Sequence, residues 1–366
     1  MKNIFKLLAF LPLLTACDDL FEPALENNRD LEAMHKEPSY AQGILANAYI
    51  ILPYETSPTS DLATDDAVTN EISSNYLRMA TGSWTANNNP VSQWQNRFNA
   101  ILYINLFLEN VDKVEWAKDE RISTMFLDRL KGEAYGLRAL HMYYLLRAHG
   151  GKIADGTLMG VPIILKSEGP DADFNHARAT YSDCVKQIME DAGKAIELLP
   201  LDYKKFADSE IPEKYRNIGV TNASDYRRVC GEEYRGLMSG RIALAVRAQT
   251  ALLAASPAFQ SGSGMTWEQA ADYAAEIIEK ANGGGGCGLD ADGLEWYTLA
   301  DKDYGTGGSP AEVIWRSSTD DNNTLETANF PPSLYGNGRV NPTQNLVDAF
   351  PMANGYPISE TSGNYN

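Results

Sequence analysis

The sequence feature that most constrains the fold is the spacing of apolar residues along the chain. Apolar side chains recur every three to four residues over long stretches, which is the pattern of helices that bury one face. Period-two alternation, the sign of strands, is rare and short. These stretches cover residues 40–52, 94–114, 126–149, 181–199, 242–255 and 267–281. The sequence therefore predicts a mainly α fold with long irregular loops and a few short strands.

Residues at the ends of these stretches support the helical prediction. Thr180 and Asp183 have the spacing of a capping box at the start of one helix, and Pro200 is placed to end it. Gly150 and Gly151 follow residues 126–149, and we expect them to adopt left-handed conformations that end that helix.

Small residues at helical spacing mark the last two stretches. Alanines recur at residues 245–255, and Trp267 is followed by alanines with the same period. Small side chains let two helices approach closely, and a helix, a turn and a second helix of this kind resemble a tetratricopeptide repeat. We therefore expect a tetratricopeptide-like scaffold of helical hairpins.

The N-terminus has the layout of a bacterial lipoprotein signal. Lys2 and Lys6 precede an apolar run, residues 7–14, which ends in Leu14-Thr15-Ala16-Cys17. The run is too short to span a membrane and matches a signal peptide followed by a lipobox. We therefore predict a signal peptide over residues 1–16, a lipidated Cys17 and a tether over residues 17–38. Several acyl chains on Cys17 would suffice for stable membrane anchoring.

Composition and charge limit the partners. With 366 residues and 44% hydrophobic content, the chain can bury a substantial core. A formal net charge of −18 opposes binding to nucleic acid and favours a neutral ligand. The cysteines other than Cys17 are Cys184, Cys230 and Cys287, without the spacing of a zinc site. We predict no metal and no cofactor.

Several separate segments resemble the SusD/RagB family of outer-membrane nutrient-binding lipoproteins. The most recognisable is Gly132-Glu133-Ala134-Tyr135-Gly136-Leu137-Arg138-Ala139-Leu140-His141, which runs on to Arg147 and is followed by Gly160-Val161-Pro162. The others occur in the family's order, at residues 41–49, 94–111, 195–200, 240–257 and 342–350. The resemblance implies one SusD-like α-helical domain over residues 39–366. Relatives continue well beyond the last segment, so we expect a C-terminal part to be missing after Asn366.

The resemblance also implies a function. Such a protein is anchored by lipid on the extracellular face of the outer membrane, and Asp18 and Asp19 resemble the signal for export to that face. It captures oligosaccharides and delivers them, as a lid, to a SusC-like TonB-dependent transporter. The implied activity is binding without catalysis. Relatives on this scaffold also import peptides, so a peptide ligand stays open.

Aromatic and amide residues outside the predicted helices are the candidate ligand contacts. Flat rings stack on the apolar face of a sugar, and amides and charged groups bond its hydroxyls. One candidate group lies within residues 61–90 and the other within residues 283–335. They comprise Asp66, Arg78, Trp84, Asn87 and Asn88 in the first, and Trp296 and Tyr335 in the second. Each aromatic residue could instead pack under its loop.

Two other functions compete with ligand capture. A secreted glycoside hydrolase would also be acidic and rich in aromatic residues, with two carboxylates flanking the scissile bond. Glu133 is the most tempting acid, although its helical position favours pairing with a nearby arginine. A repeat protein that gathers other lipoproteins is the second alternative.

Overall fold

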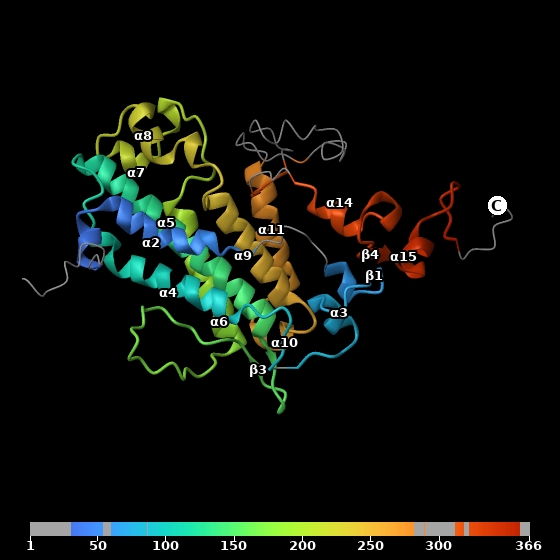
Figure 1. Cartoon of the computed structure of the whole chain (residues 1–366). Coiled ribbons are helices and arrows are strands. Elements are labelled where there is room, and N and C mark those ends of the chain that lie inside the picture. The colour runs from blue at the N-terminus through green and yellow to red at the C-terminus, as the bar shows by residue number, and fades with distance from the viewer. Residues whose placement is uncertain are drawn as a thin grey trace, which may run out of the picture.

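The computed structural model describes residues 31–53, 60–85, 87–281, 289, 312–317 and 322–358. Figure 1 shows a mainly helical body with a smaller C-terminal part beside it, so the predicted fold class is confirmed. The long helices are α2 (Pro38–Ile50), α4 (Trp94–Asn110), α5 (Glu120–His149), α6 (Tyr181–Leu198), α9 (Gly240–Ala255) and α11 (Trp267–Ala281). Shorter ones are α3 (Asn75–Ala80), α7 (Glu213–Arg216), α8 (Ala223–Cys230), α10 (Gln260–Ser263), α14 (Thr324–Asn329) and α15 (Gln344–Ala349).

The long helices occupy the predicted stretches, with one clear difference at the start of α5. We expected this helix to begin at residue 126, and it begins at Glu120. Asp119 caps the earlier start, since its carboxylate accepts a hydrogen bond from the Arg121 amide at 2.9 Å. The first turns then bury Ile122 and Met125 in a separate apolar cluster. Packing against that cluster lengthens the helix.

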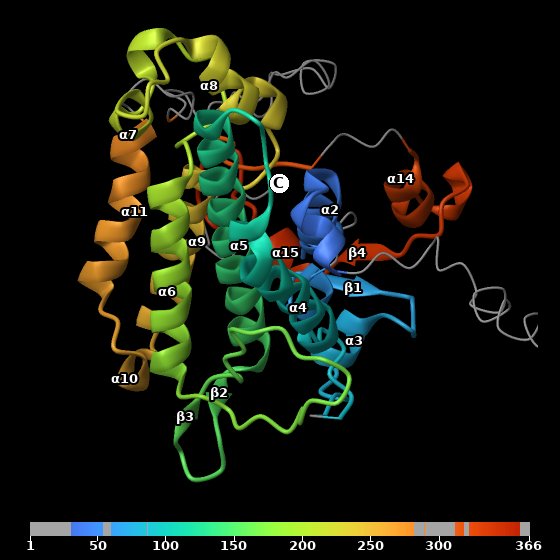
Figure 2. The same cartoon turned by 90° about the vertical axis from the view of Figure 1, so that its left-hand side faces the viewer.

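The long helices pack on one another in chain order. α2 contacts α4, α4 contacts α5, α5 contacts α6, α6 contacts α9, and α9 contacts α11. Figure 2 shows this row from α11 across to α2. α5 also touches α2 and α9, so the row bends around it. This arrangement agrees with the predicted scaffold of stacked helical hairpins.

Two apolar clusters hold the body together. The main one joins all six long helices and contains fully buried side chains such as Phe107, Leu137 and Tyr181. Cys184 is buried within it. The smaller cluster lies under α7 and α8, where Tyr215 and Tyr226 cover the first turns of α5.

Gly150 ends α5 in a way that differs from the prediction. Its φ of −75° is not left-handed, and Gly151 is absent from the residues with positive φ. The glycine is required for space instead. A Cβ atom at residue 150 would lie 2.6 Å from the Leu146 carbonyl oxygen and 2.9 Å from the Tyr181 ring.

We therefore expect Gly150→Ala to lower the free energy of unfolding by about 1–3 kcal/mol, because a methyl group must be forced into a filled site. Urea unfolding followed by circular dichroism measures this. Gly151→Ala is the matched control, since a Cβ atom there meets nothing within 4 Å. Equal stability of the two variants would contradict the steric explanation.

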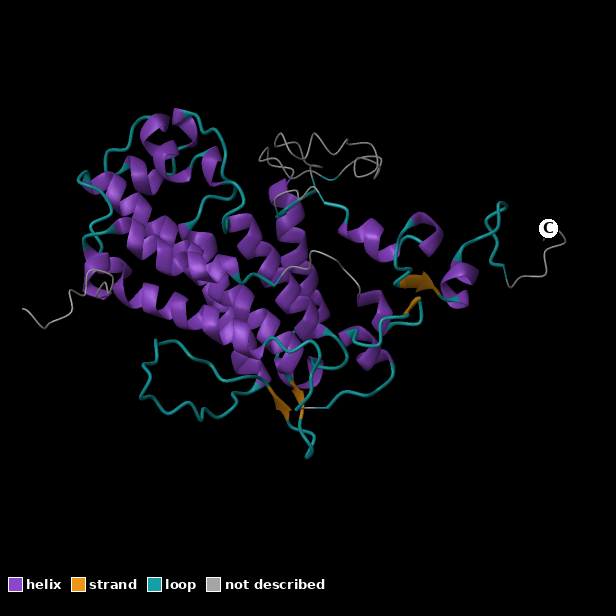
Figure 3. Ribbon diagram, in the orientation of Figure 1, coloured by secondary structure: helices purple, strands orange, loops and turns teal. Residues whose placement is uncertain are grey.

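The strands are short and form two antiparallel pairs (Figure 3). β2 (Gly151–Lys152) pairs with β3 (Leu158–Met159), and β1 (Ala67–Thr69) pairs with β4 (Val340–Pro342). The expectation that residues 61–90 form a loop is wrong, since that region contains β1 and α3. The strand β1 forms there because β4 supplies a partner from far along the chain.

Two smaller expectations also need correction. We expected the tether to run to residue 38, whereas Leu31–His35 already forms a 3-10 helix with Met34 completely buried. The apolar run Val313-Ile314-Trp315 also predicts a short buried strand. The residues there form no strand, although Trp315 packs on the main cluster and its indole donates to the Gly236 carbonyl at 2.8 Å.

Within the described part of the chain, every helix is too short or too polar to cross a bilayer.

Candidate functional site

Most of the predicted ligand contacts lie in, or directly after in the chain, one small unit at the side of the helical body. β1 and α3 belong to it, and both pack on a 3-10 helix at Ser60–Ala63. β4 joins through its pairing with β1, and Figure 1 shows α3, β1, β4 and α15 close together. We call this unit, residues 60–85 and 87–88 with 332–349, the β1–β4 face.

Hydrogen bonds from Thr343, which follows β4 and caps α15, fix Asp66 on this face. The Thr343 amide donates to the Asp66 carbonyl at 2.8 Å, and the Thr343 hydroxyl donates to the Asp65 carbonyl. The backbone of Asp66 is thus held in place, while the residue itself remains exposed. Arg78 lies in the last turn of α3 and is half-buried, so it is on a helix rather than on the expected loop.

Trp84 and the two amide residues are close along the chain, just after α3. Trp84 is 49% exposed, so the alternative that it packs under its loop is wrong. The Asn88 amide donates to the Thr85 carbonyl at 3.0 Å, which closes a tight turn between them. Both Asn87 and Asn88 are exposed. An exposed indole therefore precedes a turn that carries two exposed amides.

Tyr335 precedes β4 and is 96% exposed, so its core alternative is wrong. It also has a φ of 63°, in the left-handed region that bulky residues avoid. Its amide donates to the Pro332 carbonyl at 3.1 Å, which fixes the turn. Strained backbone conformations cluster at functional sites, so Tyr335 remains a candidate ligand contact.

The remaining predicted positions lie outside the described residues. These are the lipidation site at Cys17 and the second tryptophan, Trp296. Their roles stay predictions.

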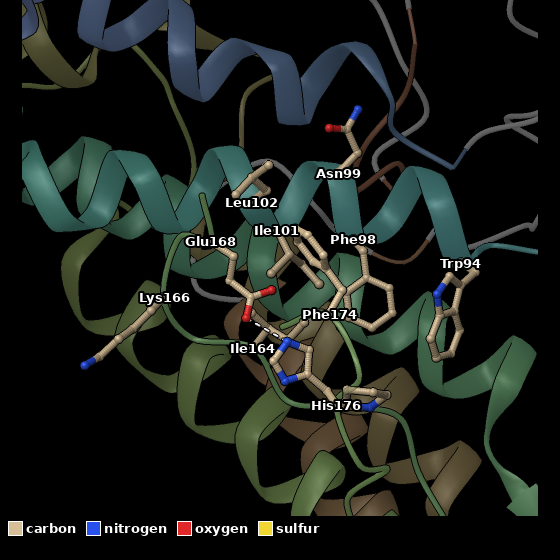
Figure 4. Close-up of a pocket in the computed structure, with 11 residues that line it drawn as sticks. Trp94, Phe98, Asn99, Ile101, Leu102, Ile164, Lys166, Glu168, Phe174 and His176 are labelled. Atoms are coloured by element: carbon tan, nitrogen blue, oxygen red, sulfur yellow. Dashed lines mark ion pairs between the residues drawn. The ribbon is translucent and has the colours of Figure 1, made fainter. Parts of the chain in front are cut away.

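A pocket that the sequence analysis missed lies between α4 and the segment after β3 (Figure 4). Its volume is about 300 Å³. Helix α4 contributes Trp94, Phe98, Asn99, Ile101 and Leu102, and the later segment contributes Pro162, Ile164, Lys166, Glu168, Phe174 and His176. We name it the α4 pocket. The helical spacing of Trp94, Phe98 and Ile101 predicts a buried helix face. The same spacing is the sequence signal that could have revealed the α4 pocket.

The wall of the α4 pocket is tied to the helical body. Asn105 of α4 donates through its side-chain nitrogen to the carbonyls of Ile164 and Lys166, at 3.0 and 3.1 Å. Glu109 accepts from the Ser167 amide at 2.8 Å. Farther along, Arg178 donates to the Gly160 carbonyl at 2.7 Å. These contacts hold both ends of the segment from residue 160 to residue 178.

The candidate catalytic acid of the hydrolase alternative is part of the scaffold. Glu133 is buried, 3.5 Å from the Arg129 Nε, and accepts a hydrogen bond from the Tyr49 hydroxyl at 2.7 Å. Burial raises the pKa of Glu133, and Arg129 opposes that rise. Because Glu133 does not line the α4 pocket, we interpret it as a structural carboxylate. The expected pairing with an arginine is confirmed.

The described part of the chain has no group of three or more His, Cys, Asp or Glu residues able to hold a metal ion. His141 accepts from the Arg97 guanidinium and donates to the Ala48 carbonyl, and His149 accepts from the Gln93 amide.

Known structures share this fold. A SusD-like protein from Bacteroides fragilis superposes with a TM-score of 0.62 at 18% identity, over 91% of this chain and 56% of that one. A SusD superfamily protein from Bacteroides vulgatus gives 0.58 at 18% identity, over 86% and 62%. A SusD-like carbohydrate binding protein from Bacteroides fragilis gives 0.58 at 18% identity, over 91% and 57%. The chain thus spans 56% to 62% of the length of these structures.

Sequence comparison identifies the family. No curated protein matches the chain. A family model described as SusD-like, starch-binding and associating with the outer membrane matches residues 25–214, more than half of the chain. The protein therefore belongs to the SusD-like family.

Proposed function

We propose that this protein captures oligosaccharides at the cell surface and delivers them to a TonB-dependent outer-membrane transporter without cleaving them. The observation that carries the proposal is the exposed Trp84 ring beside the turn with Asn87 and Asn88. Family membership supports it, since the family is described as starch-binding and one similar structure is of a carbohydrate binding protein.

The chemistry of these side chains suits a sugar. An indole face sheds water against the C–H face of a pyranose, and amides can donate and accept at its hydroxyls. Asp66 and Arg78 add charged partners for hydroxyl groups, and the strained, exposed Tyr335, in the turn before β4, adds a second ring. Trp296 is proposed as a further ring.

The placement of the protein is part of the proposal. Lipid on Cys17 would hold the body at the extracellular surface of the outer membrane, next to a SusC-like transporter that it covers as a lid. The family's description as associating with the outer membrane supports this location. Co-purification from membranes with an affinity-tagged chain tests it, and the Cys17→Ala variant should lose both membrane association and the transporter.

We expect Trp84→Ala to weaken binding to the cognate glycan about 5- to 30-fold, because the indole supplies about 1–2 kcal/mol of stacking and apolar burial. Retention on gels that contain single polysaccharides measures this and also identifies the ligand. Tyr335→Ala should weaken retention in the same assay.

The matched control is Trp267→Ala. Trp267 lies on α11 and has the same exposed fraction as Trp84, 49%. Its removal should leave retention unchanged, and helical circular dichroism should be unchanged in every variant. Equal retention of all three variants and the parent would remove the β1–β4 face as the binding site. Release of new reducing ends from a polysaccharide would instead support the hydrolase, and retention of peptides alone would support a peptide importer.

A further inference from the structure

The α4 pocket is a second ligand site of a different chemical character. We propose that it binds an aryl group of one or two rings that carries a hydrogen-bond donor, such as a phenol. The proposal goes beyond the capture of glycan on the β1–β4 face, since none of the pocket's lining residues belongs to that face.

The lining of the pocket is mainly hydrocarbon. Ile101, Pro162 and Ile164 contribute aliphatic surface, and three aromatic rings complete the walls. Two of these rings are well exposed, Trp94 by 43% and Phe174 by 63%. Large apolar side chains that remain open to solvent around a concavity are typical of ligand sites.

The aromatic wall on α4 is held in a fixed orientation. The Trp94 ring meets the Phe98 ring edge-on, with centroids 4.8 Å apart, and the His149 ring from the other side at 5.3 Å. On the opposite side, Asn105 and Glu109 bind the segment from Ile164 to Ser167, which fixes the part of the wall that Ile164 and Lys166 form. A preformed pocket binds a rigid ligand without the cost of ordering its walls.

One edge of the pocket is polar. The His176 Nε2 and the Glu168 Oε1 are 2.7 Å apart, and Figure 4 shows the two groups facing each other. Their side chains are only 34% and 21% exposed. A carboxylate accepts hydrogen bonds through both oxygens, so Glu168 can accept from a ligand hydroxyl while it pairs with His176.

This distribution of groups favours an aryl ligand over a sugar. A pyranose carries hydroxyls around its whole rim, and those that face hydrocarbon walls would lose their hydrogen bonds to water. Figure 4 shows the side chains of Lys166 and Asn99 pointing away from the Glu168–His176 pair, so polar groups meet a ligand at one edge. A flat ring with a single donor places its apolar faces on hydrocarbon and its hydroxyl on Glu168. A volume of about 300 Å³ accommodates one or two such rings.

The test uses 4-fluorophenol and the full chain. Its fluorine-19 resonance should broaden and shift on addition of the protein, and titration should give saturable binding. Phe174→Ala should weaken that binding about tenfold, since it removes one aromatic wall. Glu168→Gln should weaken it about three- to tenfold, since a neutral acceptor replaces a charged one.

Controls separate this site from general stickiness and from the glycan site. Phe350→Ala removes a phenylalanine of similar exposure, 67%, outside the pocket, and should leave 4-fluorophenol binding unchanged. Trp84→Ala should also leave it unchanged, so loss of glycan binding and loss of aryl binding are distinguishable. Fluorobenzene should bind more weakly than 4-fluorophenol, and methyl glucoside should not compete. Unchanged binding in Phe174→Ala, or displacement by methyl glucoside at equal concentration, would overturn the proposal.

Discussion

Replacing Arg138 by methionine is expected to lower the free energy of unfolding by about 3–5 kcal/mol. Arg138 of α5 binds Asp191 of α6 through two hydrogen bonds, of 2.7 and 2.8 Å, and both side chains are almost completely buried. A third bond of 2.9 Å reaches the Asn105 side chain on α4. The variant leaves the Asp191 carboxylate buried without its positive partner. This costs far more free energy than replacement of the whole ion pair by apolar side chains would cost.

Urea unfolding at pH 7 measures the loss, and a double variant isolates its cause. Arg138→Met with Asp191→Leu removes both charges from the helix interface, so it should recover most of the stability that the single variant loses. A single variant within about 1 kcal/mol of the parent would show that water reaches Asp191 and that the interface is less tightly closed than the structure indicates.

His141 is expected to make the fold sensitive to acid. Its ring is completely buried on α5. The Nε2 lies 3.1 Å from the Ala48 carbonyl oxygen, and the Nδ1 lies 3.2 Å from the Arg97 guanidinium nitrogen. A carbonyl needs a donor and a guanidinium needs an acceptor, so the neutral ring carries its proton on Nε2. Burial and then the Arg97 charge lower the pKa of His141 to about 3.

The sign of the effect follows from proton binding. Between pH 6.5 and pH 3 the unfolded chain protonates this histidine and the folded chain does not, so stability falls as the pH falls. Above pH 6.5 His141 does not lower the free energy of unfolding. Below pH 6.5 it lowers that free energy by about 1.4 kcal/mol per pH unit, a total of about 4–5 kcal/mol by pH 3.

Unfolding free energies of the parent and of His141→Gln, measured from pH 8 to pH 4, test this expectation. Glutamine can donate and accept like the neutral ring but does not titrate, so its profile should lose one proton's slope below pH 6.5. The carboxylates titrate in both proteins and cancel in the difference. Parallel profiles would show that His141 titrates in the folded protein as it does in the unfolded chain, which would contradict the expectation.

The sequence predicted the helices well because their apolar spacing is a local property. Residues 181–199 carried both a periodic stripe and a capping residue, and α6 begins at Tyr181 with Thr180 accepting from the Asp183 amide. The start of α5 was harder to predict from the sequence, because residues 120–125 are stabilised by an apolar cluster that they form with residues 211–230. That contact leaves no periodic signal of its own.

The candidate sites were predictable to different degrees. Trp84 with its neighbouring amides stood out as an aromatic residue in a polar segment, and the structure exposes it. The α4 pocket did not stand out, because Phe174 and His176 lie in a polar segment without periodicity while Trp94 and Phe98 follow the period of a buried helix face. Only the fold of the segment back over α4 brings the two sets together.

The order in which the elements pack has a consequence for how the chain acquires its structure. Contacts between successive long helices join segments that are much closer in sequence than β1 and β4, and contacts of smaller sequence separation form more rapidly. The pairing of Ala67–Thr69 with Val340–Pro342 joins segments at opposite ends of the described chain. Its closure carries a larger entropic cost and needs the whole chain to be present. The scaffold can therefore assemble early, while the surface that carries Asp66 and Tyr335 is completed last.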